Sequence, residues 1–104
     1  MASKHFHLHL VSDATGETVD LVARAALVQF KNIDQTEHVW NMVRSESQIR
    51  EIIDGVRENP GFVLCTLVDN DMRTLLENSC RELKVPCIPI LDPVVNALGS
   101  YLKA

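Results

Sequence analysis

Residues 12–18 carry the side chains and the backbone freedom that an anion-binding turn needs. This segment reads Ser-Asp-Ala-Thr-Gly-Glu-Thr and lies between a strand-like apolar stretch and an amphipathic, helix-like stretch. Gly16 lets a ligand approach the backbone, and Thr15 and Thr18 add hydroxyl donors. A helix that begins here offers unpaired N–H groups and the positive end of its dipole. The pattern predicts an anion or phosphate site formed by Ser12, Asp13, Thr15, Gly16, Glu17 and Thr18.

Two well-known phosphate loops do not fit this segment. A Walker A loop, GxxxxGK[ST], requires a lysine, and the dinucleotide-binding pattern GxGxxG requires three glycines. Residues 12–18 contain no lysine and a single glycine. The alternative interpretation is an ordinary strand-to-helix turn, in which Thr15 is the N-cap and Glu17 adds negative charge to the first turn. The spacing leaves both interpretations open.

A second polar group, Asp69-Asn70-Asp71, follows the strongly apolar run 62–68. If the two strands are neighbours in a parallel sheet, this group and the turn face one crevice at the topological switch point. Asp13 could then join Asp69 and Asp71 as a magnesium-binding group of the kind found in phosphoacceptor receiver domains. A receiver also needs a fifth strand and a lysine at a strand end, and neither is visible in the sequence. The alternative is that Asp69 and Asp71 only cap a helix.

The histidines at 5, 7 and 9 alternate along the first strand, so their side chains point to one face. Residues 5 and 9 of a strand lie about 13 Å apart, so one metal ion cannot reach all three imidazoles. Two of them would need further ligands from elsewhere. We therefore expect His5, His7 and His9 to form a semi-polar face that a helix or another domain covers, with no metal site. Cys65, Cys80 and Cys87 lack metal-ligand spacing and are expected to be buried free thiols.

Four strand-then-helix units position these residues. Strands are predicted at 5–11, 37–43, 62–68 and 85–91. Pro86 and Pro89 place the last strand at a sheet edge. The order of elements predicts a three-layer, Rossmann-like α/β fold with a parallel sheet of strand order 2-1-3-4, right-handed crossovers and helices on both faces.

Apolar stripes and capping residues predict the four helices. The first spans 16–30, and the second begins with a capping box of Ser45 and Gln48. Asp69-Asn70-Asp71 is predicted to cap the third helix, and Asp92 is the predicted N-cap of the fourth, where a proline follows it. The stripe of the last helix consists of Val94, Leu98, Tyr101 and Leu102.

Composition and charge set the class of protein. The chain has 104 residues, 46% of them hydrophobic, and a net charge of −4, which predicts one domain and disfavours nucleic acid and anionic membranes as partners. No apolar run spans a bilayer, and histidines interrupt any signal sequence, so we expect a cytoplasmic protein. A last helix with no glycine cap, in a sheet of only four strands, leads us to expect that residues 1–104 are part of a longer chain.

The opening segment resembles the start of the pyruvate, phosphate dikinase regulatory proteins, the family that includes the phosphoenolpyruvate synthase regulators. The resemblance continues through Ala23-Arg24-Ala25-Ala26, Gln29-Phe30, Val43-Arg44-Ser45, Leu67-Val68 and Leu91-Asp92-Pro93. It covers essentially the whole chain but only the N-terminal part of the family's length.

The resemblance implies a bifunctional regulator. Members phosphorylate a threonine of the dikinase or synthase with ADP as donor, and this inactivates the target once its neighbouring catalytic histidine is phosphorylated. They remove the phosphate with inorganic phosphate and release pyrophosphate. The family's P-loop lies downstream, so residues 1–104 are expected to hold no catalytic residue and no cofactor, while the parent protein uses ADP and phosphate. The implied partners are the target enzyme and the parent's kinase domain. The alternative is a non-catalytic interaction or dimerisation module.

Overall fold

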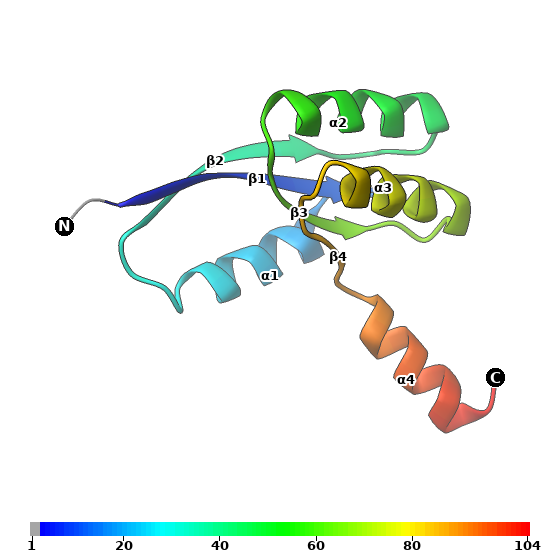
Figure 1. The fold of residues 1–104 in the computed structure, drawn as a ribbon. Helices are drawn as coiled ribbons and strands as arrows, with labels where there is room; N and C mark the ends of the chain where they lie inside the picture. Colours follow the sequence, from blue (N-terminus) through cyan, green and yellow to red (C-terminus); the bar gives the residue numbers. More distant parts are fainter. Residues whose placement is uncertain (1–2) are drawn as a thin grey trace.

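A computed structural model describes residues 3–104 as four parallel strands alternating with four helices (Figure 1). The strands are β1 (Lys4–Ser12), β2 (Ile33–Trp40), β3 (Gly61–Thr66) and β4 (Cys87–Pro89). The helices are α1 (Glu17–Leu27), α2 (Glu46–Glu58), α3 (Asn70–Glu82) and α4 (Asp92–Leu102). No helix within the described range has both the length and the apolar character needed to cross a membrane.

The sheet has the order β2-β1-β3-β4, and all three neighbouring pairs are parallel, so the predicted fold class and strand order are confirmed. Helix α1 covers one face and α2 and α3 cover the other (Figure 1). Each face has its own core, because alternate residues of the central strands point to opposite sides. Thus Leu8, Leu10 and Leu64 pack with α1, while Val11, Val63 and Cys65 pack with α2 and α3.

Helices α2 and α3 form as their sequences predict. Ser45 is the N-cap of α2, where its hydroxyl accepts a hydrogen bond from the Gln48 amide at 3.3 Å. Asp69 caps α3 in the same way, accepting from the Met72 amide at 2.9 Å. All four residues of the apolar stripe of α2 are buried: Ile49, Ile52, Ile53 and Val56.

The ends of β2 and β3 and the length of β4 differ from the prediction, each for a local reason. Strand β2 spans 33–40 rather than 37–43, because Met42 has a positive φ of 56° and its N–H turns to the carbonyl of Ala14. Strand β3 ends at Thr66 rather than 68, because the N–H of Val68 bonds a carboxylate instead of a neighbouring strand. Strand β4 is only three residues long within the predicted 85–91, because the prolines remove ladder donors.

Helix α1 is also shorter than predicted, ending at Leu27 rather than at 30. Its predicted stripe is only partly covered: Val19 and Ala23 are buried, but Val22 and Phe30 are exposed. Helix α4 departs furthest from the prediction, since it extends away from the sheet (Figure 1) and buries none of its residues. The face of the sheet beside α1 therefore lacks a second helix.

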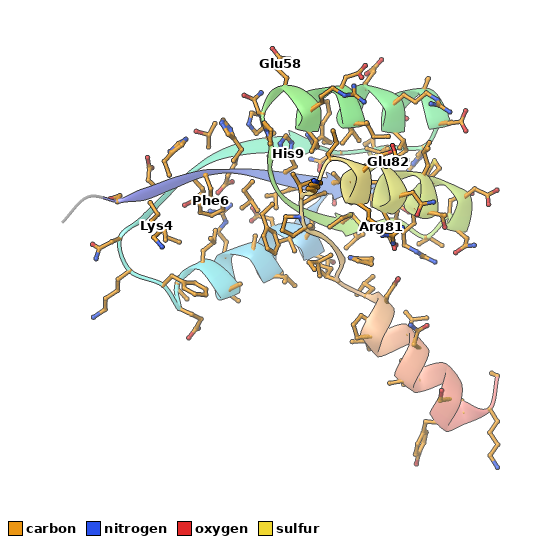
Figure 2. All side chains as sticks on the ribbon, viewed as in Figure 1. Lys4, Phe6, His9, Glu58, Arg81 and Glu82 are labelled. Carbon is orange, nitrogen blue, oxygen red and sulfur yellow. The ribbon has the colours of Figure 1, made fainter. Side chains whose placement is uncertain are left out.

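The histidines of β1 form an ordered array with β2. His9 is fully buried beneath the C-terminal end of α2, near Glu58 in Figure 2. The indole N–H of Trp40 donates to His9 Nδ1 at 3.3 Å, and His9 Nε2 donates to the Asn59 carbonyl at 2.9 Å. Because an indole only donates and a carbonyl only accepts, these two bonds specify the neutral tautomer with the proton on Nε2. His9 thus belongs to the covered semi-polar face that its spacing predicts.

The outer histidines pair with β2 as well. The ring of His38 stacks on His9 with centroids 4.5 Å apart and shares a 3.0 Å hydrogen bond with His7. His5 lies 3.0 Å from the carboxylate of Asp34. Within residues 3–104, no group of three or more His, Cys, Asp or Glu side chains is arranged to hold a metal ion.

The three cysteines are free, as expected, and their thiols form one contact group between β3, α3 and β4. Cys65 and Cys80 are buried and Cys87 is half-buried. Hydrogen bonding to the Cys65 thiol, together with burial, raises the pKa of Cys87 to about 12. The pKa of Cys80 is raised as well, by its hydrogen bond with Cys87 and by burial. Thiols whose pKa is raised, as at Cys80 and Cys87, are poor nucleophiles.

The environment of His9 predicts an acid-sensitive fold. Burial lowers the pKa of His9 below its usual 6.5, and the nearby His38 and His7 act in the same direction, although the Asn59 carbonyl opposes them. As the pH falls, the unfolded chain therefore takes up this proton before the folded chain does. Stability is full above about pH 6.5 and decreases as the pH falls below it. The measurement is the free energy of unfolding in urea at several pH values, with the His9 titration followed by NMR.

A matched pair of variants isolates this effect. Replacing His9 with Gln removes the titrating group and should flatten the pH dependence, whereas His5→Gln changes an exposed histidine and should leave it nearly unchanged. An NMR titration in which His9 protonates at or above the usual pKa would contradict the interpretation.

The close pairing of β1 and β3 predicts an intolerant glycine. A Cβ at Gly61 would overlap the carbonyl oxygen of His7 in the neighbouring strand. We expect Gly61→Ala to lower the free energy of unfolding by about 1–3 kcal/mol, the usual cost of overpacking. At Gly99 in α4, a Cβ meets only the Ala104 carbonyl at 3.5 Å. Gly99→Ala should therefore be neutral or stabilising, and equal stability of the two variants in urea would refute the expectation.

Candidate anion-binding crevice at the carboxyl ends of the strands

A crevice of about 410 Å³ opens where the carboxyl ends of β1 and β3 meet. This is the predicted topological switch point, since β1 leads to β2 on one side while β3 leads to β4 on the other. Its walls are the turn after β1, the end of β3, Arg73 of α3 and the first turn of α4. The lining includes all six residues predicted for the turn: Ser12, Asp13, Thr15, Gly16, Glu17 and Thr18.

Backbone hydrogen bonds clamp the turn from two sides. The carbonyls of Ser12 and Ala14 accept from the amides of Val43 and Met42 at 3.0 and 2.9 Å, which fixes the turn to the segment after β2. On the other side, the Asp13 amide donates to the Thr66 carbonyl at 3.2 Å. The turn is therefore held in one shape before any ligand arrives.

Two of the predicted ligand side chains are engaged in holding this shape. The buried Ser12 hydroxyl accepts from the Ala14 amide at 3.0 Å. One carboxylate oxygen of Asp13 accepts from the Val68 amide at 2.9 Å and so ties the turn to the end of β3. These contacts give Ser12 and Asp13 structural roles in the crevice, while Thr15, Glu17 and Thr18 remain exposed.

Gly16, not Thr15, is the N-cap of α1, so the predicted cap is wrong. Gly16 has a left-handed backbone with φ of 87°, and no side chain caps the helix. A Cβ here would overlap the side-chain oxygen of Asn41. The left-handed backbone therefore favours glycine at this position, and any larger residue would also displace the Asn41 side chain. Without a side-chain cap, the first-turn N–H groups of α1 stay available at the crevice wall.

Arg73 is the cation that sequence reasoning missed. Its guanidinium donates to the Leu67 carbonyl at 3.1 Å and to Asn70 Oδ1 at 2.7 Å. It also lies 3.7 Å from a Glu77 oxygen and 3.6 Å from Asp92 Oδ2. The sequence feature that could have identified Arg73 is its position one turn after the Asp69 cap, at the end of α3 that faces the switch point. The Arg73 side chain is 22% exposed, so it is partly buried but still accessible from solvent.

Asp92 also differs from its predicted role. The N-cap of α4 is Leu91, and Asp92 is the first helical residue, with no side-chain cap bond. Its carboxylate approaches Arg73 instead. Arg44 lines a second, shallower opening on the far side of Asp13, where its Nε donates to the Asp13 carbonyl at 3.1 Å. The lining of the crevice thus contains one cationic side chain, Arg73, beside acidic ones such as Asp92.

The second polar group, Asp69-Asn70-Asp71, does not enter the crevice as predicted. Asp69 lines the shallower opening, Asn70 holds Arg73, and neither Asn70 nor Asp71 belongs to the lining of either space. The acids expected for a receiver-type magnesium site, Asp13, Asp69 and Asp71, are therefore not assembled as a metal-binding group in the described part of the chain.

The geometry of the turn predicts different costs for two neighbouring substitutions. Gly16→Ala forces alanine into a left-handed conformation against Asn41 and should cost about 1–3 kcal/mol of stability. Thr15→Ala should cost less than about 0.5 kcal/mol, because Thr15 caps nothing, whereas loss of a working cap costs about 1 kcal/mol. Urea unfolding measures both, and a larger loss for Thr15→Ala would restore the original cap assignment.

Comparison with known proteins identifies the family to which the chain is similar. Residues 8–104 match the family described as kinase/pyrophosphorylase. A protein of Paramagnetospirillum magneticum named as a pyruvate, phosphate dikinase regulatory protein is 54% identical over 99 residues, which is 95% of this chain and 32% of that protein. Proteins with the same name from Rhodospirillum rubrum and Bartonella tribocorum are each 46% identical, over 99% and 95% of this chain and 38% and 36% of their own lengths.

The chain spans about a third of the length of these relatives. The match nevertheless includes the crevice turn, the segment after β2 and the end of β3 that hold this turn, and α4. The chain belongs to the kinase/pyrophosphorylase family.

Proposed function

We propose that this chain is the N-terminal α/β domain of a bifunctional regulator of pyruvate, phosphate dikinase or phosphoenolpyruvate synthase. The parent protein would phosphorylate a threonine of its target with ADP and remove that phosphate with inorganic phosphate, releasing pyrophosphate, in the cytoplasm. Family membership and the names of the relatives support the target and the reaction class. The observation that carries a role for this domain is the crevice at the switch point, with an uncapped helix N-terminus in its wall.

In this proposal the domain binds phosphate and does not transfer it. The helix N–H groups and the hydroxyls of Thr15 and Thr18 supply donors for anionic oxygens. The crevice contains no lysine or histidine among its lining residues, and the Asp13 carboxylate already accepts a backbone hydrogen bond. Residues 1–104 alone are therefore expected to be inactive, and the groups that move the phosphoryl group would belong to a separate kinase domain of the parent protein.

Arg73 suits an exchangeable anion contact. Its separation of 3.6 Å from Asp92 is longer than the roughly 2.7–2.9 Å of a strong charge-assisted hydrogen bond. A phosphate with two or more charged oxygens can compete for this guanidinium without first breaking a tight ion pair. The neighbouring acids, Glu17 and Asp92, would limit the affinity, so millimolar binding is expected.

Titration of the 104-residue chain with phosphate, pyrophosphate or ADP tests the proposed site. The amide NMR signals of Gly16 and Thr18 should shift and saturate in the millimolar range. Arg73→Gln should weaken the response, whereas Arg57→Gln, at an exposed ion pair on α2, should not. Unchanged Gly16 and Thr18 signals in the wild-type chain at millimolar ligand would refute phosphate binding here.

A second candidate function is a non-catalytic module that docks the target enzyme. The exposed apolar residues of α4 favour it, because a helix that buries nothing in its own chain presents a contact surface. A pull-down of the dikinase by the 104-residue chain distinguishes the two, since absence of binding counts against the module and leaves the phosphate site untouched.

A further inference from the structure

Two half-buried histidines face each other across the first two strands of the sheet. Strands β1 and β2 run side by side (Figure 1), with His9 opposite His38 and His7 two positions before His9 on the same face. The Nδ1 atom of His7 lies 3.0 Å from Nε2 of His38, and the ring centroids are 5.1 Å apart. In such a hydrogen bond one ring donates its proton and the other accepts it with a lone pair. Two imidazole nitrogens are therefore directed at one point between the strands.

The buried ring of His9 holds this pair in place and does not compete with it for a ligand. Both ring nitrogens of His9 are engaged, one by the Trp40 indole at 3.3 Å and the other by the Asn59 carbonyl at 2.9 Å. The ring stacks on His38 with centroids 4.5 Å apart and planes 14° apart. His38 is therefore supported on one side while its Nε2 faces His7. Histidines that bind metals are commonly oriented by neighbours in this way.

His5 lies beside the pair but is occupied elsewhere. Its Nδ1 lies 3.0 Å from the Asp34 carboxylate, and its Nε2 lies 3.2 Å from the Thr36 hydroxyl. Its ring meets His7 edge-on, with centroids 5.6 Å apart. Both nitrogens of His5 thus have oxygen partners, and the two nitrogens that face each other belong to His7 and His38.

The separation of these two nitrogens is close to what a bound metal ion requires. Zinc binds histidine nitrogen at about 2.0–2.1 Å in tetrahedral geometry, which places two such nitrogens about 3.3–3.4 Å apart. The pair would have to open by only about 0.3–0.4 Å to admit an ion. Both side chains are half-buried, so the ion can enter from solvent. Imidazole donors favour zinc, nickel and copper, whereas magnesium and calcium favour oxygen.

We propose that His7 and His38 bind a divalent transition-metal ion of the zinc class, which replaces the proton shared by the two rings and joins β1 to β2. The ring that gives up this proton is protonated at its other nitrogen and stays neutral. The spacing of histidines along β1 requires a ligand from elsewhere, and β2 supplies it. Residues 3–104 bring no third His, Cys, Asp or Glu side chain into such a group, so water fills the remaining positions and the ion is exchangeable. This inference is independent of the proposed function.

Titration of the untagged 104-residue chain with zinc chloride in phosphate-free buffer tests the site. Calorimetry should give one ion per chain. The NMR signals of the ring nitrogens should shift most at His7 Nδ1 and His38 Nε2, with little change at His5. Magnesium chloride at the same ionic strength should leave all of these signals in place, because magnesium prefers oxygen ligands.

Matched substitutions identify the ligands. His7→Gln and His38→Gln should each weaken zinc binding at least about tenfold, since even loss of an indirect partner of a metal ligand costs that much. His5→Gln makes the same change on the same face of β1 and should bind zinc like the wild type. Cys87→Ser should also bind normally, which separates the histidine pair from the free thiols. Circular dichroism verifies that each variant is folded.

Several outcomes would overturn the site. A wild-type chain that takes up no zinc at millimolar concentration would show that the pair is a hydrogen bond alone, and an equal response to magnesium would indicate an unspecific charge effect. Equal loss with His5→Gln would move the ion to the outer histidines, and loss with Cys87→Ser would assign it to the thiols. If His7→Gln or His38→Gln does not fold, the wild-type spectra decide, because zinc shifts confined to other nitrogens would contradict the assignment.

Discussion

The pairing of β1 with both β2 and β3 is the constraint on which the rest of this structure depends. The central strand runs parallel to each neighbour, so its carboxyl end must lie beside that of β3. This placement creates the crevice, because the turn after β1 and the start of α3 then emerge at one edge of the sheet. The same pairing brings His7 and His9 against His38 of β2 in the middle of the strand.

Secondary structure could be predicted from the sequence best where an element depends on residues close to it in the chain. The apolar run of β3 and the stripe of α2 belong to this class, as do the caps at Ser45 and Asp69. Strand β2 was harder to delimit, because its polar first half is held by cross-strand contacts such as Asp34 with His5. Residues 33–36 contain no sequence pattern that predicts these cross-strand contacts.

The crevice was predicted in location but not in chemistry. The turn residues lie at the switch point as their order implies, yet the cap depends on the left-handed backbone of Gly16 against Asn41, a contact between distant segments. Arg73 was missed for a similar reason, since its importance comes from Leu67 and Asp92 rather than from a motif.

The Asp13 carboxylate has a mechanical consequence beyond its local hydrogen bond. It joins the turn to Val68, the adjoining Leu67 carbonyl holds Arg73, and Arg73 approaches Asp92 at the start of α4. These contacts form a continuous linkage from one wall of the crevice to the other and onward to the projecting helix. An anion that displaced Asp92 from Arg73 would therefore also remove a contact at the start of α4.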